Sequence, residues 1–568
     1  MLTNSVFTKK YALGLAATAC FFFAWMLYFF FLNLNTGSSD YTAGGVTATI
    51  QFFYNFLNGL PFQTSLYAID QGLGFHNQYA YLNTYAIHIN LIPFLFSPIW
   101  NIWPTISWLN GIIFIINYSC MAIFAWKTLR LLSPNSYKIK FIVALGLTLS
   151  SGFLFTFQQN AQFLLFSGPF ILGAYYFLLI RQKNTFILFI IMLCMISEDA
   201  AMVALTFSLY VYLFERDAKH FALWAGTFSF IYLTVTLLII QPAARAELEL
   251  TSSTTTMVVF NHILKFIPDL NILFVGFSPV LFFIPAFLII RLVFGRPEIS
   301  LFKMAGLVLL SPLPHWGESA VVGASHHLMP IVVFLFAGFI TTLGKTPDTH
   351  LTRAPLQKEK LILVLALTIL FFMSSFRILI SNLPEEILPN IYRIAGKIDR
   401  AHKIERSIAY RKDNQRILAI AREIPKQNSL VFWTNSSIGG YIADRSHVWP
   451  FPNHYDLVDY LLLQPDAHQS FFYFLPKSGD SLNDAIKKGI GVTLNDAEIS
   501  KKSVELIIQN LVLKEKSHRI VVEEPGIVLL ERIRRELLYV PRSTIGFGWV
   551  DNIGKQIFSQ KKEKQVNQ

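Results

Sequence analysis

The stretch Lys183-Asn-Thr-Phe-Ile-Leu-Phe-Ile-Ile-Met-Leu-Cys-Met-Ile-Ser-Glu198-Asp199 is an apolar run that ends in two adjacent carboxylates. Lys183 to Ser197 makes about 15 residues, or ~22 Å of helix, which is shorter than the ~30 Å hydrocarbon core of a bilayer. A second apolar run, residues 200–214, follows at once. The stretch therefore predicts a helical hairpin in a membrane, with Glu198 and Asp199 at its tip near the membrane boundary.

The composition supports a membrane protein over the whole chain. Of 568 residues, 53% are hydrophobic and only 14% are charged, whereas soluble proteins carry about 25% charged residues. The net charge of +12 does not indicate nucleic-acid binding, because the basic residues of the first 380 positions lie in short loops between apolar runs. Such loops fit topology signals and contact with anionic lipid headgroups. The three cysteines, Cys20, Cys120 and Cys194, lie inside apolar runs and read as core residues.

Twelve hydrophobic runs are visible, and most are long enough to cross a bilayer as helices. They are residues 11–33, 86–103, 107–126, 141–157, 163–180, 184–197, 200–214, 221–240, 271–294, 300–313, 328–343 and 361–380.

The orientation follows from the rule that Lys and Arg concentrate in cytoplasmic loops. If all twelve runs crossed, the loop 127–140, with four basic residues, would lie outside. If 86–103 does not cross, every basic loop lies inside. This segment contains Pro93 and Pro98 and is followed by Pro104, which suits a broken interfacial or re-entrant helix. We therefore expect about eleven spans, a cytoplasmic N-terminus, and a first outer loop, 34–106, with interfacial helices.

After residue 380 the apolar character ends. Strand-like runs at Leu430–Trp433, Leu457–Leu463, Ile520–Glu523 and Ile527–Leu530 alternate with helical patterns at 412–424 and 500–514. Such alternation is typical of an α/β domain. The sequence thus predicts a transmembrane domain over 1–380, an α/β domain outside the membrane over 381–560, and a disordered tail over 561–568.

Two acidic sites lie near the outer boundary in this topology. Asp40 follows the first run beside glycines and could act as a general base, or cap a helix or turn. Glu198 and Asp199 would repel each other unless a cation or basic residue is present; otherwise they form a solvated tip that caps the next helix. An ionisable residue at membrane depth is a candidate functional residue, because its burial is costly. Asp40, Glu198 and Asp199 are also the candidate ligands of a divalent cation.

Histidines and further cations lie in the same outer loops. His88 falls in the segment 86–103, where it reads either as a functional residue or as a satisfied core residue. A second group in one short outer loop consists of His315, Glu318, His326 and His327. These side chains could bind a metal or a phosphate, although their spacing matches no known zinc site. Arg245 and Lys265 could pair with a phosphate or simply anchor the membrane surface.

Motifs of nucleotide-driven and soluble-type chemistry do not occur. The chain has no phosphate-binding P-loop, no dinucleotide fingerprint, no nucleophile elbow and no His-Glu-x-x-His. These absences argue against nucleotide-driven transport and against soluble-type hydrolysis.

The order of short motifs resembles the bacterial predicted membrane protein family called domain of unknown function 2079, which is grouped with the GT-C glycosyltransferases. The motifs are Asp40, Asn58-Gly59-Leu-Pro-Phe62, His88 with its proline-rich segment, Ser197-Glu198-Asp199, His326-His327 before Pro330, Asn428-Ser-Leu-Val-Phe-Trp-Thr-Asn435 and Ala443-Asp-Arg445. The likeness covers nearly the whole chain. The family usually has His-Tyr where this chain has His326-His327, so either histidine can be the equivalent one.

The resemblance implies a polytopic α-helical GT-C-like enzyme of the bacterial inner membrane, with its C-terminal domain in the periplasm. It would move a sugar from a polyprenyl-phosphate-linked donor to a glycan, lipid or protein acceptor. Asp40 would be the base, and Glu198 and Asp199 would orient hydroxyls or hold a divalent cation. The donor phosphate would be held by His88, Arg245 and His326 or His327.

Two other classes of function remain as alternatives. A transporter or flippase for a lipid-linked or polar solute would place ionisable groups near mid-membrane, often with inverted repeats, and neither feature is visible. A non-catalytic envelope assembly protein would need none of the acidic residues. The substitutions Asp40→Asn and Glu198→Gln distinguish these classes from a transferase.

Overall fold

The computed structural model describes residues 45–57, 63–64, 82–83, 106–144 without 139 and 143, 163–246, 329–345, 388–394, 419–425, 430–433, 447–449, 458–463 and 504–533 without 506, with a few single positions between them. Everything below concerns these residues. Of the predicted spans, 11–33, 271–294, 300–313, 361–380 and most of 141–157 lie outside them.

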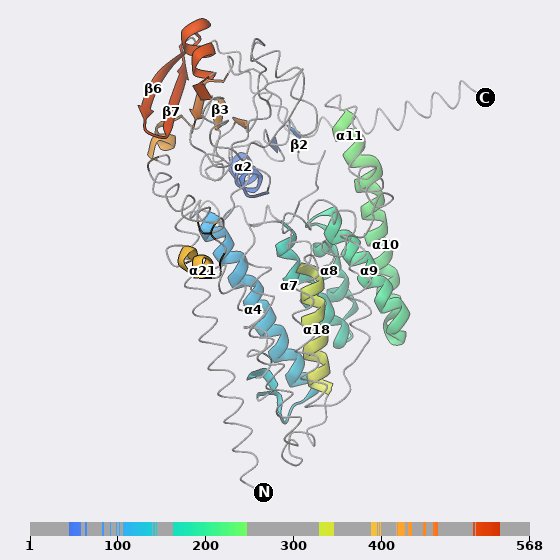
Figure 1. Cartoon of the computed structure of the whole chain (residues 1–568). Coiled ribbons are helices and arrows are strands. Elements are labelled where there is room, and N and C mark those ends of the chain that lie inside the picture. The colour runs from blue at the N-terminus through green and yellow to red at the C-terminus, as the bar shows by residue number, and fades with distance from the viewer. Residues whose placement is uncertain are drawn as a thin grey trace, which may run out of the picture.

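Six of the predicted apolar runs are helices (Figure 1). The bundle consists of α4 (Ile106–Leu132), the short η4 (Phe163–Phe166), α7 (Ser167–Leu179), α8 (Lys183–Cys194), α9 (Glu198–Phe214), η5 (Arg216–Ala218), α10 (Lys219–Val235), the π-helix η6 (Thr236–Ile240), α11 (Gln241–Ala246) and α18 (Met329–Lys345). Two more helices are α2 (Gly45–Leu57), inside the predicted first outer loop, and α21 (Leu388–Ile394).

One helix in this part of the chain is long and apolar enough to cross a membrane. It runs over 28 residues, Arg216–Ala243, and joins η5, α10, η6 and the start of α11. Its outward face carries large exposed apolar side chains, among them Trp224, Phe230 and Leu238. Such a surface is unfavourable in water and suits lipid. Shorter apolar helices are Leu164–Leu179, Lys183–Cys194 and Met329–Lys345; the total of about eleven spans stays a prediction.

Helix α18 forms the centre of the bundle. Every residue from Met329 to Gly344 is buried. Phe334 packs edge-on against Phe207 of α9, and Phe336 packs against Phe124 of α4. The end of α18 is fixed to the end of α4, because the Ser133 hydroxyl donates a hydrogen bond to the carbonyl of Gly344. Aromatic packing and this hydrogen bond therefore hold α18 against α4 and α9.

The basic turns gather at one end of the bundle. Arg181, in the turn after α7, lies 3.4 Å from Glu215 and 3.7 Å from Asp217, which follow α9. Ammonium groups of Lys127 and Lys183 lie over aromatic rings of neighbouring helices, at 5.7 and 5.4 Å from the ring centres. Within the described part of the chain, Lys127, Arg181 and Lys183, which the sequence assigns to one side, thus share one end of the helices. That this end faces the cytoplasm stays a prediction.

A five-stranded mixed sheet follows in the last third of the chain. Its strands are β3 (Leu430–Trp433), β4 (His447–Trp449), β5 (Tyr460–Leu463), β6 (His518–Glu524) and β7 (Ile527–Arg532), in the order β4-β3-β5-β7-β6. The first three are parallel and the others antiparallel. Residues 504–514 are largely helical and pack Val504, Ile507 and Leu511 on Leu461, Leu463 and Leu530. The short strands β1 (Gln63–Thr64) and β2 (Leu82–Asn83) pair separately.

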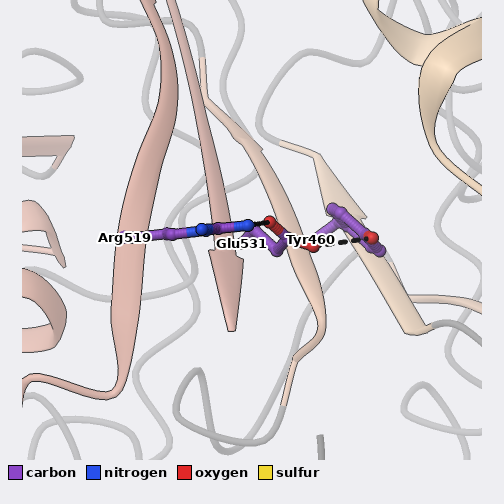
Figure 2. Close-up of polar contacts among 3 residues, drawn as sticks. All are labelled: Tyr460, Arg519 and Glu531. Carbon is purple, nitrogen blue, oxygen red and sulfur yellow. Dashed lines mark hydrogen bonds and ion pairs between the residues drawn. The ribbon is translucent and has the colours of Figure 1, made fainter. Parts of the chain in front are cut away.

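A polar row crosses three neighbouring strands of this sheet (Figure 2). Glu531 of β7 is paired in register with both Tyr460 and Arg519. One carboxylate oxygen accepts from the Tyr460 hydroxyl at 3.1 Å, and the other accepts from two guanidinium nitrogens of Arg519 at 3.0 and 2.7 Å. Figure 1 shows the sheet beyond the end of the bundle at which α4 begins. The expected α/β content is present, while the domain limits 381–560 stay a prediction.

Candidate functional site

Glu198 and Asp199 begin helix α9 directly after the end of α8. Between the two helices, Ser197 has an extended backbone (φ −168°, ψ 168°), and its hydroxyl accepts a hydrogen bond from the Ala200 amide at 3.2 Å. This is the geometry of an N-cap, for which serine is among the preferred residues. The two carboxylates occupy the first turn, where the helix dipole stabilises negative charge. The predicted hairpin is present, and the residue that caps its second helix is Ser197 rather than either carboxylate.

Burial separates the two acidic residues. Glu198 is only 6% exposed and Asp199 is half-buried. A fully solvated tip therefore does not describe Glu198, because its side chain is buried. Keeping a carboxylate in such a place is costly unless it is hydrogen-bonded or paired. Glu198 is accordingly the strongest candidate functional residue in the part of the chain that the structure describes.

Polar groups of α8 and α10 lie next to Glu198. The Cys194 thiol and the Ser229 hydroxyl are 3.4 Å apart. One turn further along α10, the Tyr232 hydroxyl lies within electrostatic range of both Glu198 and Cys194. The inner side of the hairpin tip is therefore polar, although the surrounding helices are almost wholly apolar.

One described residue of the segment 86–103, Leu91, contacts the chain close to the same tip. The amide of Leu91 donates a hydrogen bond to the carbonyl of Met195 at 2.8 Å. Met195 stands three positions before Glu198. The contact places Leu91 beside the end of α8; that the segment 86–103 is a broken interfacial or re-entrant helix stays a prediction.

A second buried polar contact lies in the half of the bundle that contains the start of α7. The Asn117 amide of α4 donates to the carbonyls of Ile113, at 2.8 Å, and Leu165, at 3.0 Å. Gly168 lies against the same side chain, since an added Cβ would stand 2.3 Å from the Asn117 oxygen. Asn117 thus joins α4 to η4 and fixes where α7 begins.

The other predicted site residues cannot be placed with Glu198. Asp40, His88, His315, Glu318, Lys265, His326 and His327 lie outside the described residues. Arg245 lies in α11, but its side chain is outside them too. Within the described part of the chain, no group of three or more His, Cys, Asp or Glu side chains is arranged to hold a metal. The shared chamber and the cation site stay predictions.

Sequence reasoning missed Ser229, Tyr232 and Asn117, because each stands alone inside an apolar run and forms no recognisable motif. One signal was available: Ser229, Tyr232 and Thr236 have the spacing of a single helix face.

Comparison with known proteins gives a family and no closer relative. No curated protein and no solved structure matches the chain. Residues 33–490, well over half of the 568, match the family described as "Predicted membrane protein (DUF2079)". The chain belongs to this family of predicted membrane proteins.

Proposed function

We propose that this protein is an integral-membrane glycosyltransferase with a GT-C-like architecture. It would transfer a sugar from a polyprenyl-phosphate-linked donor to an envelope acceptor at the outer face of the bacterial inner membrane. About eleven spans would carry the site, and the α/β domain in the periplasm would position the acceptor.

The observation that carries the proposal is the buried Glu198 at the end of the bundle opposite the basic turns. By the positive-inside rule the basic turns would face the cytoplasm, and Glu198 would then lie at the outer face. A sugar donor attached to a lipid carrier would present its sugar at the outer face of the membrane, at the depth of Glu198. Segment 86–103, which touches the hairpin tip through Leu91, would line the lateral entrance for the lipid.

In the proposed reaction the acceptor oxygen attacks the anomeric carbon of the donor sugar. The bond from that carbon to the phosphate oxygen breaks, and Asp40 takes the proton of the acceptor hydroxyl. Glu198 and Asp199 orient hydroxyl groups of sugar or acceptor. His88, Arg245 and His326 or His327 stabilise the charge that develops on the leaving phosphate. Carboxylates are also ligands that Mg²⁺ prefers, and a divalent cation on Asp40, Glu198 and Asp199 would offset phosphate charge.

The test is product analysis in cells that lack the gene and carry variant copies. Envelope glycans, glycolipids and glycoproteins are compared by mass spectrometry. Asp40→Asn should lower the product by about 10² to 10⁴, the usual contribution of a general base, and Glu198→Gln should also lower it strongly. Asp217→Asn is the matched control, because this exposed carboxylate lies at the opposite end of the bundle.

Three results are distinguishable in this experiment. Loss of one glycan in the deletion strain and in both site variants, with normal membrane levels of the variants, supports the transferase. Accumulation of an unchanged lipid-linked precursor on the cytoplasmic side indicates a flippase instead. Full activity of both site variants indicates an assembly protein and contradicts the proposal.

A further inference from the structure

A polar stripe runs along the buried face of the membrane-spanning helix α10–α11. Ser229, Thr236 and Gln241 are at most 1% exposed, and the hydroxyl of Tyr232 is also shielded from solvent. The opposite face carries exposed apolar residues such as Phe230 and Leu238. Polar groups on the buried face of a membrane helix are costly unless they bind each other or a ligand.

The π-helix puts Gln241 on this stripe. The amide of Gln241 donates to the carbonyl of Thr236, five residues earlier, so these two residues lie one above the other. In an uninterrupted α-helix the residue above Thr236 would be Ile240. Pro242 explains the local geometry, because proline has no amide hydrogen and its ring would clash with the carbonyl four residues before it. The extra residue in this turn thus puts the Gln241 amide, instead of the apolar Ile240 side chain, on the buried face. Such π-bulges are frequent at functional sites.

Tyr232 is the member of the stripe that interacts electrostatically with Glu198. Its hydroxyl lies within electrostatic range of Glu198, and the Thr236 side chain is close to it as well. Yet among the residues that the structure describes, no hydrogen bond of standard geometry reaches this buried oxygen. A buried hydroxyl without a partner is unfavourable. The Tyr232 hydroxyl therefore fits a group whose hydrogen-bonding partner is supplied by a bound ligand.

We propose that the stripe Ser229–Tyr232–Thr236–Gln241, together with Glu198, binds the hydroxyl groups of a neutral sugar carried on a lipid. The inference rests on the proposed function and assigns the sugar, rather than the phosphate, to this face. From Phe221 to Pro242 the helix contains no charged residue, so it offers hydroxyl and amide groups only. Anionic phosphate favours cationic donors, whereas sugar hydroxyls pair with neutral groups and with a carboxylate.

A binding experiment on the full chain in lipid nanodiscs tests this subsite without requiring the natural substrate. The probe is a photoreactive alkyl β-glucoside at a concentration below that which disrupts the disc, and labelled peptides are mapped by mass spectrometry. We expect labelling of the peptide that contains residues 229–241. Octyl β-glucoside should compete for it, and an alkyl phosphate of the same chain length should not.

The variants Tyr232→Phe and Gln241→Leu remove polar atoms and keep nearly the same volume. Each should reduce competable labelling roughly tenfold, as expected for one lost hydrogen bond in a buried site. Phe230→Leu is the control, because this neighbour faces outward and should change nothing. Thermal unfolding of each variant verifies that it is folded. Ser229→Ala, which removes a single oxygen, serves as a second variant if Gln241→Leu does not fold.

Unchanged labelling in folded Tyr232→Phe, or equal competition by the alkyl phosphate, would overturn the subsite. Its failure is separable from that of the proposed function. If the glycan product depends on Asp40 but no sugar probe labels the stripe, the transferase stands and the subsite is wrong. If the probe binds but no glycan changes in the deletion strain, the subsite stands as a glycolipid-binding site and the transferase is wrong.

Discussion

Ser197 determines where the two candidate carboxylates stand. Its hydroxyl caps helix α9, so Glu198 and Asp199 begin the first turn and lie at the positive end of the helix dipole. The replacement Ser197→Ala should cost about 1 kcal/mol of stability and lower the melting temperature of the detergent-solubilised protein. Ser197→Asn, which can also cap, should melt close to the wild type. Equal melting of all three proteins would contradict the capping role.

Two glycines in helices, Gly168 and Gly226, allow a matched comparison of glycine-to-alanine substitutions. Gly168→Ala would push a methyl group to 2.3 Å from the Asn117 oxygen, whereas Gly226→Ala meets Ser208 Cβ at an ordinary 3.4 Å. We expect the first change to destabilise by about 1–3 kcal/mol through overpacking. The second should be neutral or stabilise by up to about 1 kcal/mol, because Ala favours the helix. Thermal unfolding compares them, and an equal response of both would show that Asn117 is not fixed there.

Among the elements that the structure describes, six of the predicted apolar runs are helices and predicted strands are present. Runs such as 163–180 and 200–214 coincide with helices, and Leu430–Trp433 is a strand. Three features were missed for physical reasons. Helix α4 continues to Leu132, past Lys127 and Arg130, because long basic side chains can lie along the helix while their charges stay in water. The π-helix follows from Pro242 together with packing, and β4 has only three residues, too few for an alternating pattern.

The polar row across β5, β7 and β6 should contribute measurably to the sheet. Glu531→Gln removes the charge that holds Arg519, which is 67% exposed, while Glu531 itself is only 18% exposed. An ion pair with one partner exposed to solvent contributes about 0.2–1 kcal/mol. We expect amide hydrogen exchange in β6 and β7 to quicken by roughly two- to fivefold, and less in high salt. Glu505→Gln, on an exposed helical position, is the control; exchange unchanged in both variants would contradict the contribution.

Over the whole molecule, the sequence predicts which turns belong together better than it predicts the interior of the site. Counts of Lys and Arg assign the turns that contain Arg181 and Arg216 to one side, and the ion pair between Arg181 and Glu215 joins these two turns. Glu198 was found because a carboxylate beside an apolar run is conspicuous. Tyr232 and Gln241 were not, because their proximity to the site depends on helix packing and on one extra residue in a turn. The roles of Asp40, His88, Arg245, His326 and His327 stay predictions.

The central claim is that Glu198 lies at the outer face and the basic turns at the inner face. Single cysteines are introduced at the exposed positions Asn135 and Asp217, in a background where Cys20, Cys120 and Cys194 are alanine. Spheroplasts are treated with a membrane-impermeant maleimide. We expect no labelling at either position until the membrane is permeabilised, and full labelling afterwards. Labelling of the cysteine at 135 in intact spheroplasts would put the basic turns outside and contradict the outer site.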